Sequence, residues 1–173
     1  MTAAKPTPSI AGLLCGAGGL PRHVAASLSR RGCTVVAVGI KGEADPALEE
    51  VVEELHWTGI ARLGRWLKVF RQADVDVLLM VGAIRKQRMF GSKAAMLPDW
   101  RSIKLWYEQT ASKQDHTILE AVADAFEKEG VPVGSVVDYC PDLLAPEGSL
   151  TSEEPSAAQW RDIRFAWPIA KEV

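Results

Sequence analysis

The chain has 173 residues, of which 47% are hydrophobic and 24% are charged, and this is an ordinary composition for a globular domain with a proper core. Its 20 Lys and Arg nearly balance 22 Asp and Glu, so the formal net charge is −2 and argues against a dedicated nucleic-acid binder. No apolar run reaches the ~18 residues that a membrane-spanning helix needs, and residues 1–9 lack the apolar stretch of a signal peptide.

After a flexible tail over residues 1–9, the first part of the chain alternates strand and helix. An apolar run of buried-strand type, Ile10–Cys15, leads through a glycine-rich loop into a helix that starts at Pro21 and ends near Arg31. The Val-rich segment Cys33–Ile40 then predicts a second strand.

The middle of the chain predicts two helices, a strand and a further helix. Pro46–Leu55 has the pattern of a short acidic helix, and Ile60–Gln72 carries apolar residues at helical spacing. Val75–Val81 is apolar enough for a central strand of a parallel sheet. A long irregular basic stretch, Gly82–Pro98, precedes a helix at Asp99–Thr110.

The last third of the chain contains the strongest helix pattern. Apolar residues share one face of Asp115–Glu129, and Val133–Tyr139 predicts a fourth main strand. Pro141–Thr151 is a predicted loop. The remainder, Pro155–Val173, is predicted to be a helix that is broken or kinked at Pro168.

Strands that alternate with helices predict an α/β fold, a Rossmann-like three-layer domain with a mostly parallel sheet over residues 10–154. Residues 155–173 would be a helical connection, because a free tail should not bury so apolar and aromatic a stretch. Ligands of such sheets sit beyond the carboxyl ends of the strands. Three segments are expected at those ends: Gly16–Pro21, Gly82–Arg88 and Pro141–Thr151.

The glycine-rich loop is the first candidate binding site, with residues Gly16, Gly18, Gly19, Leu20 and Pro21. A loop between a strand and a helix presents backbone N–H groups and the positive end of the helix dipole, which attract phosphate. The alternative is a tight turn without a ligand. The third glycine of a dinucleotide fingerprint is missing and so is the acid after the second strand, so a nicotinamide cofactor is not expected.

Cations follow the third predicted strand. Arg85, Lys86 and Arg88 could neutralise a pyrophosphate, and Met89 and Phe90 beside them could touch an acyl chain or a membrane surface. The alternative is a solvated basic loop.

Two further segments have a functional and a structural interpretation. Asp115 is most simply the N-cap of the strongest helix, with His116 as a surface residue, and a metal or acid–base role for the pair is the other interpretation. The loop around Glu147, Gly148 and Thr151 is either a plain connection or a ligand lid.

The sequence contains no complete catalytic constellation, because no close set of acids, nucleophile elbow or zinc-protease motif stands out. Cys15, Cys33 and Cys140 lie far apart, a distribution that favours buried thiols in a reducing cytosol over disulfides or a metal site.

Three motifs in order resemble a known family. They are Gly12–Pro21 (GLLCGAGGLP), Gln114–Leu119 (QDHTIL) and Asp142–Thr151 (DLLAPEGSLT). Together they resemble the N-terminal domain of the UDP-2,3-diacylglucosamine pyrophosphatases of the LpxI type, from about Ile10 to Val173. Lys113 and Ala83 depart from the family pattern, so only Asp115 is carried over from the second motif.

The resemblance implies a two-domain hydrolase that converts UDP-2,3-diacylglucosamine to lipid X and UMP in lipid A synthesis, with a divalent metal such as Mg²⁺ bound outside this chain. The glycine loop and the loop at Glu147–Thr151 would face a cleft between the domains, with Arg85 and Lys86 supplying charge. The catalytic acids would belong to a C-terminal domain that this chain lacks.

The favoured hypothesis is therefore a substrate-binding N-terminal domain, inactive alone, whose partners are a UDP-linked acylated sugar and the missing C-terminal domain. A cytoplasmic location, with contact to the inner face of the membrane, is expected from the acylated substrate. Nucleic acid is not an expected partner, and a homodimer is left open. The alternatives are a stand-alone nucleotide- or phosphate-binding module without catalysis and a purely structural domain.

Overall fold

The computed structural model describes residues 5–84, 98–104, 118–146, 148 and 150–172. The chain divides into two units, Met1–Leu143 and Leu144–Val173, and each is described by itself. The first unit contains the sheet and the hydrophobic core. The second unit contains the helix α7 (Ala157–Glu172).

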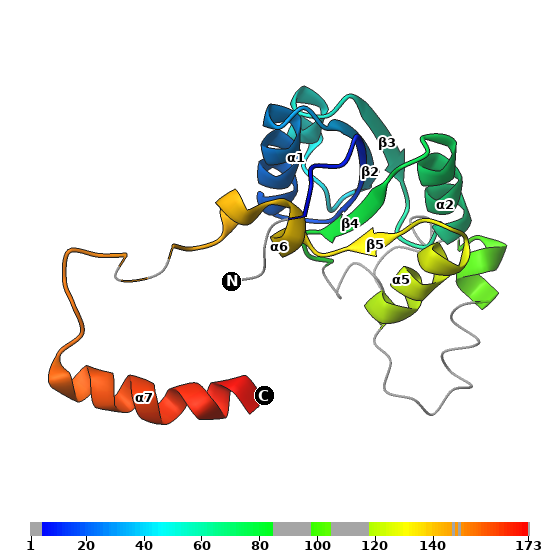
Figure 1. Ribbon diagram of the computed structural model, residues 1–173. Helices are drawn as coiled ribbons and strands as arrows, with labels where there is room; N and C mark the ends of the chain where they lie inside the picture. The colour runs from blue at the N-terminus through cyan, green and yellow to red at the C-terminus, as the bar shows by residue number, and fades with distance from the viewer. Residues whose placement is uncertain (1–4, 85–97, 105–117, 147, 149, 173) are drawn as a thin grey trace. The chain divides into compact units, whose positions relative to one another are not determined.

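The first unit is built on a five-stranded sheet with the order β3-β2-β1-β4-β5 (Figure 1). The strands are β1 (Ile10–Cys15), β2 (Thr34–Ile40), β3 (Glu54–Thr58), β4 (Val77–Val81) and β5 (Val133–Gly134). Every neighbouring pair is parallel. The predicted α/β class with a parallel sheet is confirmed.

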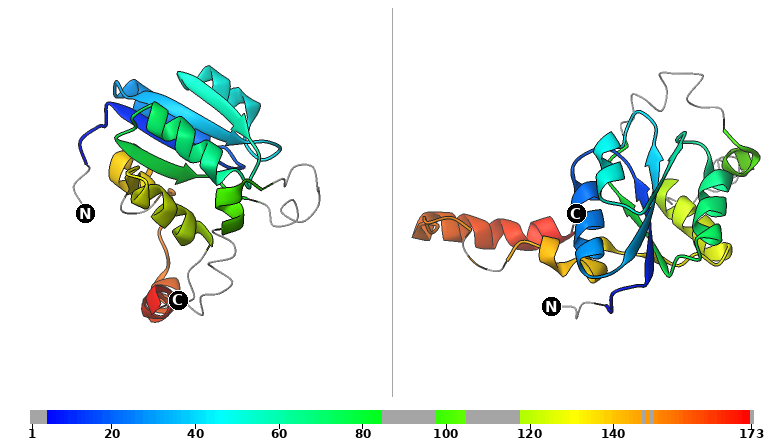
Figure 2. Two further views of the ribbon diagram at one scale, coloured as in Figure 1. Left: turned by 90° about the vertical axis from the view of Figure 1, so that its right-hand side faces the viewer. Right: turned by 90° about the horizontal axis from the view of Figure 1, so that it is seen from above.

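Helices cover both faces of this sheet, as the right-hand view of Figure 2 shows. One face carries α1 (Leu20–Arg30), the short 3₁₀ helix η1 (Pro46–Glu50) and α6 (Val136–Tyr139), and the other carries α2 (Leu63–Gln72) and α5 (Ile118–Lys128). Because both faces are covered, the central strands need no polar alternation, and their apolar runs are buried except at the partly buried Met80.

Two core clusters lie on the two faces. On the α1 side, Leu28 packs with Leu13 and Leu79, and on the α2 side Phe70 meets Phe126 edge to face at 5.9 Å between ring centroids. Residues 100–104 are helical and lie on the α2 side, and Asp99 holds this segment by accepting hydrogen bonds from the backbone N–H groups of Gly64 and Ser102.

The prediction of one acidic helix at residues 46–55 was wrong in its second half. The helix is only the 3₁₀ turn η1, and β3 follows it as the edge strand of the sheet. Tertiary packing selects the strand, because the ring of Trp57 lies over Gly39, where a Cβ would come within 2.8 Å of it. The side chain of Glu53 fixes the start of β3 by accepting a hydrogen bond from the backbone N–H of Val35 in β2 at 2.6 Å.

The prediction of a strand through Tyr139 was wrong as well. β5 ends at Gly134, and the chain turns into α6. The ring of Tyr139 folds back over Gly134, where an added Cβ would lie 2.8 Å from the ring and 2.6 Å from Val77. Within the apolar run Val133–Tyr139, the residues Val136–Tyr139 therefore form a helix on the sheet face rather than an extension of β5.

The second unit contains α7, which begins with a reciprocal cap between Ser156 and Gln159. The helix continues through Pro168, so it is not broken there, and the alternative of a kink stays a prediction. A proline removes one backbone hydrogen bond and crowds one carbonyl, and the neighbouring turns can stay helical. Apolar side chains on α7 are exposed: Trp160, Ile163, Phe165, Trp167 and Ile169.

Candidate functional site

The strand order reverses between β1 and β4. The chain leaves β1 toward β2 and β3 on one side and then crosses to β4 on the other. Cys15 and Val81, the last residues of the two strands, are register partners, so the loops that follow start side by side. Ligands of open α/β sheets bind at such a reversal, beyond the carboxyl ends of the strands.

The two loops are joined by backbone hydrogen bonds. The N–H of Gly16 donates to the carbonyl of Val81 at 2.8 Å, and that of Ala17 donates to Ala83 at 2.7 Å. The N–H of Ala83 returns a bond to Ala17 at 3.0 Å, which closes a small antiparallel bridge. The floor of the reversal point is therefore fixed by the backbone.

Two glycines make this close approach feasible. A Cβ on Gly16 would lie 2.5 Å from the carbonyl oxygen of Ala83, and one on Gly82 would lie 2.8 Å from that of Ala17. Gly82 also has a φ of +94°, which favours glycine. Both central strands thus end in the doublet Gly-Ala, a repeated signal that could have predicted the bridge from sequence.

The rest of the glycine loop is open. Gly18 has a φ of +100° and, among the described residues other than its chain neighbours, no atom within 4 Å of its Cβ position, and Gly19 is the N-cap of α1. Within the described part of the chain no side chain caps this helix, and its first turn holds no acid. Leu20 is 48% exposed, whereas Pro21 is buried and anchors the helix start.

This arrangement can bind an anionic oxygen. The first N–H groups of a helix have no intrahelical acceptor, and the helix dipole is positive at this end. At the end of β2, where dinucleotide sites place an acid, stands the exposed Lys41. The predicted residues Gly16, Gly18, Gly19, Leu20 and Pro21 therefore lie in one turn, in which Gly18, Gly19 and Leu20 are exposed.

The other predicted site residues fall into two groups. Arg85, Lys86, Asp115 and Glu147 lie outside the described residues. Gly148, with a φ of +102°, and Thr151, whose hydroxyl donates to the carbonyl of Glu153 at 2.9 Å, belong to the second unit and are described only there.

The expectation that the segment starting at Pro141 falls at the carboxyl edge of the sheet was wrong for residues 141–143. Asp142 is bound by Ser27 and Arg30, which lie in the last turn of α1. A helix between parallel strands runs back along the sheet, so its last turn lies at the edge where the strands begin. Residues 141–143 therefore leave the first unit from the edge opposite the glycine loop.

The contacts of Asp142 have an electrostatic consequence. The hydroxyl of Ser27 donates to both carboxylate oxygens, at 2.7 and 2.8 Å, and Arg30 and Arg31 add positive charge. The Ser27 hydrogen bond, followed by these cations, lowers the pKa of the Asp142 carboxyl below its ordinary value.

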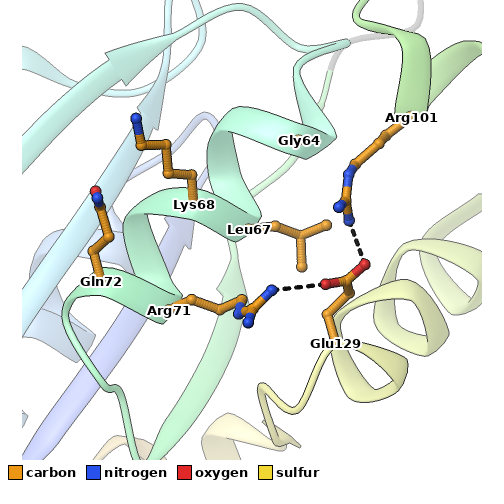
Figure 3. A pocket seen from close by; sticks show the side chains of 7 residues that line it. All are labelled: Gly64, Leu67, Lys68, Arg71, Gln72, Arg101 and Glu129. Atoms are coloured by element: carbon orange, nitrogen blue, oxygen red, sulfur yellow. Dashed lines mark hydrogen bonds and ion pairs between the residues drawn. The ribbon is translucent and has the colours of Figure 1, made fainter.

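A pocket of about 360 Å³ lies on the other face of the sheet, away from the glycine loop. Figure 3 shows Arg71 and Arg101 both directed at the carboxylate of Glu129, with an Arg71–Glu129 distance of 2.9 Å, while Lys68 and Gln72 extend away from it. These ion pairs tie the short helix to α2 and α5, which is a structural role.

Metal and thiol chemistry have little support within the described ranges. There, no group of three His, Cys, Asp or Glu side chains is arranged to hold a metal ion. All three cysteines are buried free thiols, and burial raises the pKa of Cys15 to about 12, so it stays protonated. Among the described helices, none is long and apolar enough to cross a membrane.

Comparisons with known proteins identify relatives. Residues 11–143 match the family described as the LpxI N-terminal domain. UDP-2,3-diacylglucosamine pyrophosphatase LpxI of Caulobacter vibrioides is 27% identical over 164 residues, which cover 94% of this chain and 56% of that protein. The chain thus spans little more than half the length of this relative.

A solved structure is similar at a greater distance. It is a UDP-glucose-4-epimerase from Stenotrophomonas maltophila with bound NAD and formylated UDP-arabinopyranose, with a TM-score of 0.45 and 16% identity. The similarity covers 95% of this chain and 49% of the epimerase.

Proposed function

The chain belongs to the family of LpxI N-terminal domains, and from that premise we propose that it is the substrate-binding domain of a hydrolase in lipid A synthesis. The reaction would be cleavage of UDP-2,3-diacylglucosamine to lipid X and UMP, as the name of the Caulobacter relative suggests for that protein. The observation that carries the proposal is the start of α1, which follows Gly18 and Gly19 and to which no described side chain gives a capping hydrogen bond.

The backbone would bind the pyrophosphate. N–H groups at Gly18, Gly19 and Leu20 can donate to its oxygens, because no described side chain caps α1 and the His23 ring comes no closer than 3.9 Å to the Cβ position of Gly19. The helix dipole adds about 0.3–1 kcal/mol for an anion at this position. Arg85 and Lys86 follow the β4 loop in the sequence and would neutralise further charge.

The other residues proposed for the substrate are Asp115 and the loop with Glu147, Gly148 and Thr151, which would form a wall of the cleft. A divalent cation such as Mg²⁺ would be held by acids outside this chain. The described residues offer no three-ligand cluster of their own. The chain alone is therefore expected to bind substrate and to hydrolyse nothing.

The proposed partner is a C-terminal catalytic domain. Trp160, Ile163 and Trp167 follow one side of α7, and Phe165 and Ile169 follow another. A helix that is apolar on more than one side is normally buried within protein. We place the complete enzyme in the cytoplasm, at the inner face of the membrane, because its substrate is acylated.

The test of the site is a substitution at Gly18 with a matched control. Alanine at Gly18, where φ is +100°, should distort the turn and weaken binding of UMP and UDP about tenfold by calorimetry. Gly32→Ala introduces the same kind of strain at a φ of +81°, also in open space but at the far end of α1. Gly32→Ala should lower the free energy of unfolding by about as much as Gly18→Ala does and should leave nucleotide binding unchanged.

The outcomes separate the candidate functions. Equal effects of Gly18→Ala and Gly32→Ala on binding, or no nucleotide binding by the wild-type chain, would leave a structural domain. Tight binding of unrelated nucleotides by the chain alone would favour the stand-alone module. Turnover of UDP-2,3-diacylglucosamine by the pure chain with Mg²⁺ would contradict the inactive-domain proposal.

A further inference from the structure

The outer face of α2 is strongly basic. Two exposed cations, Arg65 and Lys68, form what we term the basic stripe; Arg62 stands at the N-cap before them, and Arg71 after them is paired with Glu129. No acid occurs between Gly59 and Ala73. Leu63, Trp66, Leu67 and Phe70 are buried on the inner face, which leaves the outer half of the helix to the cations.

The outer face of the neighbouring helix α5 is acidic. Its acidic stripe consists of the exposed Asp124 and Glu127, while Ala121 and Phe126 are buried on the inner face. Both helices lie on the same side of the sheet, as the left-hand view of Figure 2 shows. In a chain with a net charge of only −2, two adjacent stripes of opposite sign are an uneven distribution of charge.

The two stripes are also aligned in height. α2 and α5 each connect parallel strands, so they run in the same direction. The Arg71–Glu129 ion pair at 2.9 Å joins the carboxyl ends of the two helices. Counting back along each helix, Lys68 and Glu127 both lie about one turn or less before this contact, and Arg65 and Asp124 both lie about one and a half turns before it.

This pattern is complementary to itself. A twofold axis that runs parallel to the helices would place α2 of one copy against α5 of the other and would leave each residue's position along the helix axis unchanged. Lys68 would then meet Glu127, and Arg65 would meet Asp124. An axis perpendicular to the helices in the same plane would place α2 against α2, with cations against cations. The charges therefore select one arrangement.

Apolar area is available beside the stripes. The short helix at residues 100–104 lies on the same side of the sheet, and its Trp100 is 77% exposed and its Ile103 is 45% exposed. Specific interfaces combine a polar rim with such anchors, and tryptophan is enriched among the residues that contribute most binding energy.

We propose that the α2/α5 face is a docking surface for a second copy of this chain, in which the basic stripe of each copy pairs with the acidic stripe of the other. The proposal concerns a surface distinct from the glycine loop and does not depend on the proposed function. Surface ion pairs contribute little one by one, so the stripes mainly determine orientation and specificity.

The experiment uses sedimentation of the full chain and two charge-reversed variants. One carries Arg65→Glu with Lys68→Glu, and the other carries Asp124→Lys with Glu127→Lys. Each alone should dimerise at least about tenfold more weakly than the wild-type chain, because like charges then face each other. An equimolar mixture should form a heterodimer, because both of its stripe pairs are again attractive.

Controls keep the result interpretable. Lys41→Glu reverses a single charge, half the change of each double variant, at an exposed site outside these helices and should leave dimerisation unchanged. Circular dichroism would verify that each variant is folded. A wild-type chain that stays monomeric, variants that dimerise as well as the wild type, or a mixture that does not associate would overturn the proposal. So would association that is lost on Trp160→Ser with Trp167→Ser but not on charge reversal.

Discussion

Ser27 shows how one buried hydroxyl fixes the end of the first unit. The residue is 1% exposed, and its Oγ donates to the carboxylate of Asp142, which is itself partly exposed. Around this pair, Arg30 contacts Asp142, and Arg31 donates to the carbonyl of Tyr139. These contacts attach residues 139–142 to the last turn of α1.

Removing the carboxylate should leave the Ser27 hydroxyl buried without its acceptor. We expect Asp142→Ala to lower the free energy of unfolding by about 1–3 kcal/mol, the cost of an unsatisfied buried polar group. Urea unfolding would measure it. In the Ser27→Ala background the same change should cost clearly less, and equal costs in both backgrounds would show that the two residues are not coupled.

The same pair predicts a pH dependence. The folded-state pKa of Asp142 is lowered, chiefly by the Ser27 hydrogen bond, so its stabilisation is present above the unfolded-state pKa of about 3.9 and is lost as the pH falls through the lower folded-state value. The stability difference between the wild type and Asp142→Asn should therefore be constant from pH 5 to 7 and shrink below about pH 4. A difference that persists unchanged at acidic pH would contradict this assignment.

Single residues of the candidate site were partly predictable from sequence. A glycine-rich turn between a strand and a helix identifies Gly16, Gly18 and Gly19 by local chemistry alone. The partner loop was not predicted in its role, because the bridge from Ala17 to Ala83 joins residues 66 positions apart and forms only once β1 and β4 are neighbours.

At the scale of elements, long apolar runs were assigned correctly and short mixed ones were not. β1, β2 and β4 follow directly from their sequences, since buried parallel strands are apolar throughout. β3 and β5 depend on contacts instead: Trp57 over Gly39 supports an edge strand, and Tyr139 over Gly134 ends one. Local propensity does not include such contacts.

Gly134 tests this explanation for β5. Valine there would place atoms against Val77 and the Tyr139 ring, where even a Cβ comes within 2.6 and 2.8 Å. We expect Gly134→Val to cost about 1–3 kcal/mol of unfolding free energy. Ser135→Ala, at the exposed neighbouring position, should cost little. Combined with Tyr139→Ala, the valine should cost less than in the wild-type background, and strict additivity would contradict the proposed contact.

For the whole molecule, the alternation of strands and helices was sufficient to predict a parallel sheet with helices on both faces, because parallel strands need crossovers. The sheet edge at which residues 141–143 lie was not predictable, since it depends on β5 ending after two residues and on the hydrogen bond that Ser27 donates to Asp142. Both features depend on contacts distant in sequence.

The division at Leu143 predicts that the first unit folds alone. All five strands, both core clusters and the Ser27–Asp142 pair lie within Met1–Leu143. A chain that ends at Leu143 should therefore unfold cooperatively in urea, with a free energy within about 1 kcal/mol of that of the full chain. Its tryptophan emission should shift to shorter wavelength, because the exposed Trp160 and Trp167 are gone.

A chain that ends at Cys140 is the matched control. It is shorter by only three more residues, yet it loses Asp142 and leaves the Ser27 hydroxyl without its acceptor, so it should be less stable than the chain ending at Leu143 by about 1–3 kcal/mol. Non-cooperative unfolding of the Leu143 chain would mean that the second unit is needed for the fold. Equal stability of the two shortened chains would instead show that the Ser27–Asp142 hydrogen bond does not contribute to the free energy of unfolding.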